Sequence, residues 1–277
     1  MKVIQLNQYV KLHDGERIFY CKYEYLHQAC EDIKRKNHDV VLIVGGSDMC
    51  IYDRHLHFIP NNVRKLFVQN CLIDKSRWGD LVQPVPRGIE VSEAVNLGPY
   101  SWCGAEKEGE EKRAILSNPP EKSPTRLVYA NFRIYTNLHH RVQIRDAAIR
   151  IPHITWSEPY GINDFQRYKD GPSYMSFVEE ILDHKAVLCA QGNDLGGNLR
   201  MYETLYLSRV PITFNPVLYD NLHYIFPVVL VRSMPELEDR EGLMKRVDEA
   251  KEQMLKNKKY LDFDYWKDMI LEEANKA

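Results

Sequence analysis

The sequence predicts an α/β protein with two domains, each built around a parallel β-sheet. Three observations carry this prediction. Short apolar runs alternate with amphipathic helical stretches along most of the chain. A charged segment with several prolines, residues 105–125, interrupts this alternation like an interdomain linker around a short helix, and the alternation then restarts. The length of 277 residues is enough for two compact halves, each with its own core.

The first half has a predicted helix at residues 24–36 and a first clear strand at residues 40–44. This strand reads Val-Val-Leu-Ile-Val, the kind of unbroken run that is buried on both faces of a parallel sheet. It ends in a Gly-Gly-Ser-Asp sequence, which predicts a turn. Shorter apolar runs at residues 66–68 and 81–85 predict two further strands.

The second half alternates strands and helices more regularly. Its predicted strands lie at residues 127–130, 151–156, 186–190, 210–214 and 225–231. Its predicted helices lie at residues 137–150, 174–182, 199–208 and 236–256, and a last helix lies at residues 263–274. Parallel sheets bind ligands in the crevice at the carboxyl ends of their strands, so the functional residues are expected there.

The predicted domains are residues 1–115 and residues 116–257. A C-terminal helical segment, residues 258–277, follows them, with the first domain as its expected packing partner. Each domain is expected to be Rossmann-like, because strand and helix alternate throughout both.

Composition excludes several classes of protein. The net charge of −2 argues against a nucleic-acid partner. No apolar run reaches the roughly 20 residues that a membrane-spanning helix needs, and the first residues do not resemble a signal peptide. The six cysteines are scattered and form no CxxC pair, which favours reduced, buried thiols in a cytoplasm-like compartment.

Residues 192–203 carry the strongest chemical signal. A loop with three glycines follows the predicted strand at 186–190 and leads into a helix, so its backbone N–H groups and the helix N-terminus favour an anion. Asn198 is a candidate N-cap, and Arg200 in the first turn can fork onto a pyrophosphate. Glu203, one turn later, is placed to accept the ribose hydroxyls of a nucleotide. The alternative is a capped helix with an ordinary Arg–Glu pair, because glycine-rich loops before helices are common.

A family resemblance favours the functional interpretation. Residues 200–212 read RMYETLYLSRVPI, which closely resembles the Arg-x-x-Glu…Leu-Tyr-Leu-Gly-x-x-Pro-Ile run of the exostosin-like glycosyltransferases. Other pieces resemble the family in the same order: VLIVGGSDMCI, IPNNVRKLFVQN, LVQPVPRGIE, LVYANFRIYTNLHHR and IFPVVLV. The resemblance covers roughly residues 40–270. The chain departs from the pattern at Ser208, where the family has Gly, and at Arg87, where an apolar residue is commoner.

The resemblance implies the GT-B fold, with two facing Rossmann-like domains and an interdomain cleft. It implies inverting transfer of a sugar from a UDP-sugar to a glycan hydroxyl, with no metal and no cofactor. The expected partners are a nucleotide-sugar donor and an oligosaccharide or glycoprotein-glycan acceptor. Small soluble members occur in bacteria and in large algal viruses, where a xylosyltransferase of this kind is known. Xylose is therefore one candidate sugar, and the cytoplasm of a bacterium or an infected host cell is the expected location. The alternative is a non-catalytic nucleotide-sugar or glycan-binding protein on the same scaffold.

Without a metal, protein groups must neutralise the leaving diphosphate, and Arg200 is the first candidate. Further donor-binding candidates follow the first strand of the second domain or its helix: Asn131, Arg133, Arg141 and Arg150. For the surface arginines the alternative is simple solvation. Tyr160 or Trp156 can stack on the nucleotide base, although the interpretation as core aromatics is favoured for both.

Inversion requires a general base for the acceptor hydroxyl, and we expect it from the first domain. Asp48 fits, because it lies in the turn that ends the strand at residues 40–44. The alternative for Asp48 is a turn-forming role, with Asp53 and Asp74 as other candidates for the base. Glu90 is expected to support the acceptor or to cap a helix.

No metal site is expected. The Asp262-Phe263-Asp264 triplet matches the DxD metal motif of other glycosyltransferases, but it opens a predicted helix, which favours a capping role. The His55-x-His57 and His139-His140 pairs have no partner ligands at metal-site spacing. The sequence also contains no GxGxxG, P-loop or GxSxG motif.

Overall fold

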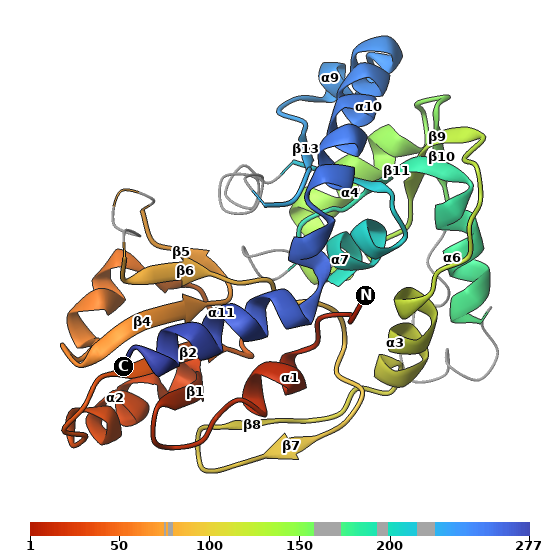
Figure 1. Ribbon diagram of the computed structural model, residues 1–277. Coiled ribbons are helices and arrows are strands. Elements are labelled where there is room, and N and C mark those ends of the chain that lie inside the picture. Colours follow the sequence, from red (N-terminus) through yellow and green to blue (C-terminus); the bar gives the residue numbers. More distant parts are fainter. Residues whose placement is uncertain (75, 77–79, 158–172, 193–198, 215–224) are drawn as a thin grey trace. The chain divides into compact units, whose positions relative to one another are not determined.

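A computed structural model describes residues 1–74, 76, 80–157, 173–192, 199–214 and 225–277 of the chain (Figure 1). The protein is a mixed α/β structure with parallel sheets. It divides into two compact units. Unit 1 consists mainly of Met1–Ala114 and Lys259–Ala277, and unit 2 mainly of Ile115–Asn193 and Arg200–Lys258.

Unit 1 is built on a four-stranded parallel sheet of order β1-β2-β4-β6. Its strands are β1 (Ile18–Lys22), β2 (Val40–Gly45), β4 (Val63–Val68) and β6 (Val82–Pro84). All six residues of β2 are buried, as the unbroken apolar run predicts for a central strand. Two small additions complete the unit: β3 (Ile51–Tyr52) pairs in parallel with β5 (Cys71–Leu72), and β7 (Val95–Asn96) pairs antiparallel with β8 (Trp102–Cys103).

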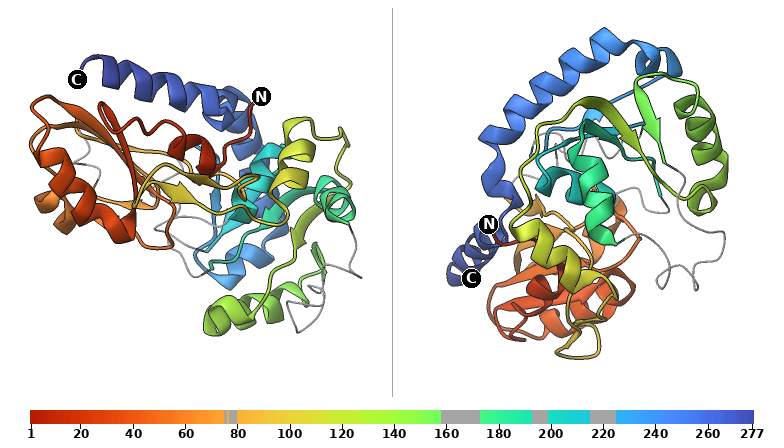
Figure 2. Two further views of the ribbon diagram at one scale, coloured as in Figure 1. Left: turned by 90° about the horizontal axis from the view of Figure 1, so that it is seen from below. Right: turned by 90° about the vertical axis from the view of Figure 1, so that its right-hand side faces the viewer.

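Two helices of unit 1 cover opposite faces of this sheet (Figure 2). Helix α2 (Leu26–Lys34) packs with the side of β2 that carries Leu42 and Val44. Helix α11 (Phe263–Asn275) contacts β2 and β4. The buried residues of α11 recur every three or four positions, so a single stripe of the helix faces the sheet. They are Phe263, Trp266, Ile270 and Ala274.

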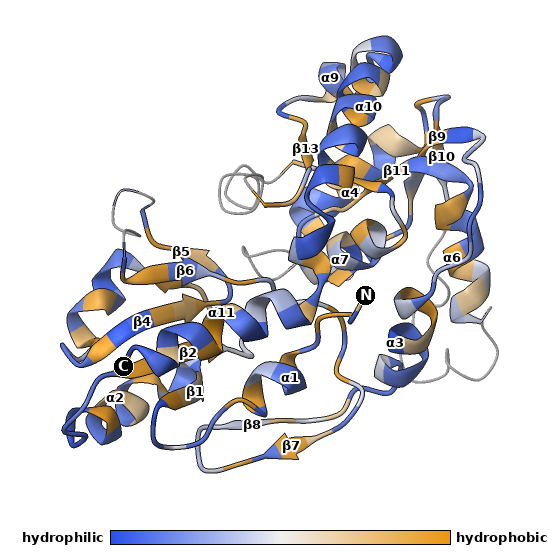
Figure 3. Ribbon diagram, viewed as in Figure 1, coloured by the Kyte–Doolittle hydropathy of each residue, from blue (hydrophilic) through white to orange (hydrophobic). Residues whose placement is uncertain are grey.

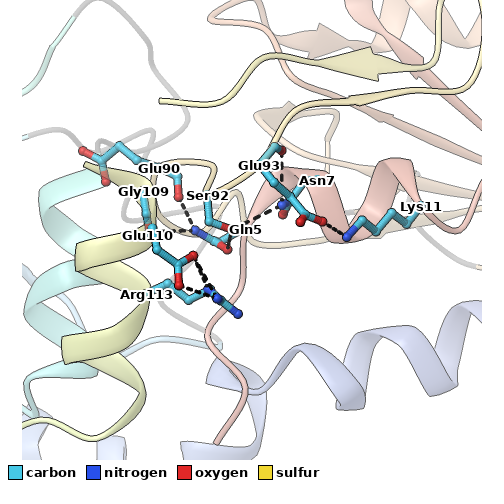
Figure 4. A network of polar contacts seen from close by, with 9 residues as sticks. All are labelled: Gln5, Asn7, Lys11, Glu90, Ser92, Glu93, Gly109, Glu110 and Arg113. Carbon is cyan, nitrogen blue, oxygen red and sulfur yellow. Dashed lines mark hydrogen bonds and ion pairs between the residues drawn. The ribbon is translucent and has the colours of Figure 1, made fainter. Parts of the chain in front are cut away.

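Polar contacts attach the N-terminal segment of unit 1 to residues 89–93 (Figure 4). Gln5 forms an isolated parallel bridge with Ile89 and donates through Nε2 to the carbonyl groups of Glu90 and Gly109. Ser92 Oγ donates to Gln5 Oε1 over 2.9 Å. The first residues of helix α1 (Leu6–Val10) and of helix α3 (Gly109–Ser117) therefore lie at the same network of hydrogen bonds.

Unit 2 is built on a five-stranded parallel sheet of order β10-β9-β11-β12-β13. Its strands are β9 (Arg126–Ala130), β10 (Ile154–Trp156), β11 (His184–Leu188), β12 (Val210–Thr213) and β13 (Val229–Leu230). Numbered along the chain, the order is 2-1-3-4-5, a common order of doubly wound α/β folds. In such a sheet the strand order reverses between the first and third strands, here β9 and β11.

The helices of unit 2 that the structure describes follow the strands in turn. They are α4 (Leu138–Ala148), α6 (Tyr174–Leu182), α7 (Leu199–Tyr206), α9 (Met234–Glu238) and α10 (Arg240–Lys256). Helix α7 is the most deeply buried of these: Met201 to Tyr206 are all buried. Helix α10 is amphipathic, with Leu243, Val247, Ala250 and Met254 buried and mostly hydrophilic residues over the rest of its surface (Figure 3).

Most predicted elements lie where the sequence places them, and the differences have local causes. Strand β1 was not expected, because its short run Ile-Phe-Tyr-Cys-Lys is defined by non-local pairing with β2. The helix expected at residues 236–256 is two helices, α9 and α10, because Asp239 adopts an extended conformation and caps α10 through Gly242 N–H. The strand expected at residues 225–231 pairs only at Val229–Leu230.

The structure also bears on composition. All six cysteines are buried and none forms a disulfide. Across the part of the chain that the structure describes, every helix is too short or too polar to cross a lipid bilayer.

Candidate functional site

The carboxyl ends of β9 and β11 are neighbours in the unit 2 sheet, at the point where the strand order reverses. Ligands of doubly wound folds bind in the crevice at such a point. Asn131 to Arg133 follow β9 here, and Cys189 to Gly192 follow β11. This edge is therefore the candidate binding edge of unit 2.

Arg141 of α4 ties these two strand ends together. Its guanidinium donates from Nε to Gln191 O over 2.7 Å, from Nη2 to Ala190 O over 3.0 Å and from Nη1 to Arg133 O over 2.6 Å. The residue is only 7% exposed. These three nitrogens hold the backbone of both loops, so Arg141 shapes the binding edge. The phosphate contact that the sequence predicts for Arg141 stays a prediction.

Gly192 lies close to this arginine. A Cβ atom on Gly192 would come within 3.4 Å of Arg141 Nη2, and Asn137 Nδ2 donates to the Gly192 carbonyl over 3.4 Å. At that distance a Cβ atom would make an ordinary van der Waals contact with a flexible side chain, so packing against Arg141 does not by itself require glycine at position 192.

Arg200 and Glu203 lie together at the start of α7. Arg200 Nη1 is 3.1 Å from Glu203 Oε2, and the guanidinium carbon lies 3.8 Å from the centroid of the Phe177 ring. The Glu203 side chain is 2% exposed, whereas that of Arg200 is 29% exposed. The carboxylate is thus buried beneath the guanidinium, and Arg200 is the member of the pair that reaches solvent.

Glu203 has a second partner on α6. The Tyr174 hydroxyl donates to Glu203 Oε1 over 3.3 Å. With its two oxygens directed to Arg200 and Tyr174, Glu203 is placed to orient Arg200. The ribose contact that the sequence predicts for Glu203 stays a prediction.

Cys189 lies immediately after β11, and the charges of both arginines affect the pKa of its thiol. Burial raises its pKa to about 12, while a hydrogen bond with Thr204 and the charges of Arg200 and Arg141 act in the opposite direction. Arg141 and Arg200 therefore both lie near the end of β11, on different helices. Two guanidinium groups near one strand end favour an anion there, although the Glu203 carboxylate offsets part of their charge.

The other predicted donor residues are placed differently. Asn131 Nδ2 donates to Ser157 O over 3.2 Å, which joins the ends of β9 and β10. Arg133 is exposed just beyond β9. Arg150 is also exposed, but it follows the C-terminal end of α4 and precedes the start of β10. Because α4 runs back along the sheet, Arg150 lies toward the amino ends of the strands and away from the candidate binding edge.

Tyr160 and Asn198 lie outside the described residues. Trp156, at the end of β10, is half-buried, and its ring meets Phe132 edge-on at 5.1 Å between centroids. It packs against the apolar core of the unit, in agreement with the core-aromatic interpretation.

Unit 1 brings its own polar residues to the carboxyl ends of β1 and β2. Asp48 follows β2 and is exposed, and its Oδ1 lies 3.2 Å from Arg87 Nη1. Next to it, Ser47 Oγ donates to a carboxylate oxygen of Glu24 over 2.7 Å. Sequence reasoning missed Glu24, because the strand that precedes it, β1, was not recognised.

The other acidic candidates have structural partners. Asp53 Oδ1 accepts from the Asp74 N–H over 2.9 Å, and Asp74 Oδ1 accepts from the Ser76 N–H over 2.8 Å. Glu90 pairs with the buried Lys112. Asp48, in contrast, is paired with the side chain of Arg87 on another loop.

Two of the residues that could suggest a metal, Asp262 and His55, have structural contacts. Asp262 Oδ1 accepts from the Asp264 N–H over 3.1 Å and caps α11, as predicted. His55 Nδ1 accepts from the Tyr52 N–H over 2.9 Å, and its Nε2 lies 3.2 Å from the Tyr23 hydroxyl. Among the described residues, no three His, Cys, Asp or Glu side chains gather as a metal site.

A shallow pocket of about 560 Å³ opens at the other end of the unit 2 sheet. Its lining includes Arg126 and Leu127 at the start of β9, His153 before β10 and Arg240 at the start of α10. The amino ends of parallel strands are not the usual ligand edge of this fold class. The pocket is therefore distinct from the candidate binding edge at β9 and β11.

The sequence matches no protein-family model, and no curated protein matches it significantly.

Proposed function

We propose that the protein is an inverting, metal-independent glycosyltransferase of the GT-B class. In this proposal unit 2 binds a UDP-sugar and unit 1 binds the glycan acceptor. The single observation that carries it is Arg200, held at the start of α7 by Glu203 and Phe177 beyond the end of β11. That edge of a doubly wound sheet is where nucleotides bind.

The chemistry requires compensation of charge on the leaving diphosphate. Arg200 is partly exposed, orders its guanidinium on a buried carboxylate and lies near the Arg141-bound loop. A preorganised cation at that position stabilises the developing charge without reorganising during the reaction. The exostosin-like run at residues 200–212 supports the same assignment.

The acceptor side of the proposal rests on Asp48. Its carboxylate is exposed at the carboxyl edge of the unit 1 sheet and paired with Arg87 on the neighbouring loop. The pairing fixes the direction of the carboxylate, which a general base needs in order to meet the acceptor hydroxyl. Arg87, where the family more often has an apolar residue, is accounted for by this contact.

A thermal-shift screen with UDP-, GDP- and CMP-sugars tests the donor class. We expect UDP compounds to stabilise the protein, because a ligand at 100 times its Kd adds about 2.7 kcal/mol to the free energy of unfolding. Replacement of Arg200 with Ala should remove most of this shift. A GDP- or CMP-sugar that stabilises where UDP does not would contradict the UDP assignment.

A transfer assay that follows UDP release tests the reaction. We expect turnover to persist in EDTA, and to fall by roughly 100-fold or more in Arg200→Ala and Asp48→Asn. Loss of activity in EDTA with recovery in Mn²⁺ would refute the metal-free mechanism. Nucleotide-sugar binding with no turnover across donors and acceptors would identify a non-catalytic binding protein instead.

A further inference from the structure

We infer that Tyr174 and Phe177 of α6 are positioning residues that hold Arg200 for the diphosphate of the donor. This inference rests on the proposed function, and it assigns a role in it to a helix that carries no recognised motif. The observation behind it is a set of contacts between two helices, α6 and α7, which follow different strands of the sheet.

The two helices contribute matching pairs. Tyr174 and Phe177 are three residues apart on α6, and Arg200 and Glu203 are three residues apart on α7, so each pair occupies one helix face. Tyr174 donates to Glu203, Glu203 pairs with Arg200, and Arg200 lies over the Phe177 ring. The contacts thus close a ring of four side chains.

Each contact removes a different freedom from the arginine. A long arginine side chain has many rotamers, and this freedom must be lost for a defined phosphate contact. The Phe177 face restrains the guanidinium from one side through a cation–π contact. Glu203 fixes a second direction, and Tyr174 in turn fixes Glu203.

The ring is itself anchored to the sheet. The Phe177 ring lies 6.0 Å from that of Tyr129, a residue of β9 that is 2% exposed. The Tyr174 and Phe177 rings are also 6.0 Å apart. Arg200 is therefore connected, through Phe177 and Tyr129, to the strand whose carboxyl end contributes to the binding edge. Such support by a rigid element is what places a functional side chain accurately.

The test uses Phe177→Leu and Tyr174→Phe, with Met175→Leu as the matched control on the same helix. We expect the ratio of the Kd values for UMP and UDP, measured by calorimetry, to fall about tenfold in Arg200→Ala. It should fall several-fold in Phe177→Leu and Tyr174→Phe and stay unchanged in the control. The ratio isolates the β-phosphate contact, and a loss of packing alone would not change it.

A double-mutant cycle gives the second readout. If Phe177 acts through Arg200, then Phe177→Leu should lower kcat in the wild-type background and have no further effect in Arg200→Ala. Additive losses in the cycle would overturn the inference, as would a UMP/UDP ratio in both α6 variants equal to that of the control.

Failure of the inference differs from failure of the proposed function. If Arg200→Ala loses UDP selectivity and turnover while both α6 variants match Met175→Leu, the positioning role is wrong and the donor assignment stands. If Arg200→Ala itself binds UDP and UMP as the wild type does, the donor assignment is wrong.

Discussion

Ser208 adopts a backbone conformation that usually favours glycine. Helix α7 ends in paired hydrogen bonds, from the Ser208 N–H to Leu205 O and from the Arg209 N–H to Thr204 O, both over 2.9 Å. This is the Schellman pattern, which places the residue after the helix end in the left-handed region. Ser208 has φ 56° there, at the position where exostosin-like proteins have Gly.

Replacement of Ser208 with Gly should therefore stabilise the protein. Glycine adopts this conformation without the steric conflict of a Cβ atom, a gain of roughly 1 kcal/mol in the free energy of unfolding. Urea denaturation measures it. The matched variant Ser208→Ala keeps the Cβ atom and removes the hydroxyl, so it should give no such gain. Equal stabilities for Ser208→Gly and Ser208→Ala would show that the backbone is not strained.

At the scale of elements, the N-terminal segment depends on a glycine distant in the sequence. Gly88 has φ +82°, and a Cβ atom on it would lie 2.1 Å from the carbonyl oxygen of Ile4. That oxygen accepts from the Ile89 N–H over 2.9 Å, beside the Gln5 bridge. The attachment of α1 to this loop thus requires a residue without a side chain.

Substitution of Gly88 with Ala should cost about 2–4 kcal/mol of stability, the sum of backbone strain and a lost buried hydrogen bond. Hydrogen exchange should also rise at Gln5 and Ile89, which would locate the loss. Gly104→Ala is the control, since a Cβ atom there meets nothing within 4 Å. Similar stability losses in the two variants would contradict the steric argument.

At the scale of the whole molecule, one half-buried lysine gives stability an unusual pH dependence. Lys251 of α10 donates to Ser208 O over 2.5 Å. Burial, with the nearby charges of Arg209 and Lys258, lowers the pKa of Lys251 from 10.5 to about 8. Between pH 8 and 10.5 the unfolded chain therefore binds more protons at this residue than the folded one, so its contribution to stability rises with pH.

We expect the difference in unfolding free energy between the wild type and Lys251→Met to grow in favour of the wild type from about pH 8 to 10.5. Guanidinium denaturation at several pH values measures it, and other titrations cancel in the difference. Lys245→Met, which removes an exposed lysine from the same helix, should leave the difference from wild type flat with pH. A flat profile for Lys251→Met would show that Lys251 has an ordinary pKa.

The candidate site was predictable only in part. Arg200 and Glu203 were identifiable because they lie one helical turn apart, and that spacing is local. Their support from Tyr174 and Phe177 was not, since nothing in the sequence states that α6 packs beside α7. Glu24 was missed for the same reason, because β1 is recognisable mainly through its pairing with β2.

The sequence by itself determined the alternation of strands and helices, the two halves, the cap at Asp262 and the Arg–Glu pair of α7, because periodicity and short spacings act within a few residues. Only the tertiary structure decided the strand order with β10 outside β9, the use of Arg141 on three backbone carbonyls and the burial of Glu203 beneath Arg200. These features depend on pairings between residues far apart in the sequence. Buried backbone and side-chain polar groups need hydrogen-bond partners, and the folded chain decides which residues supply them.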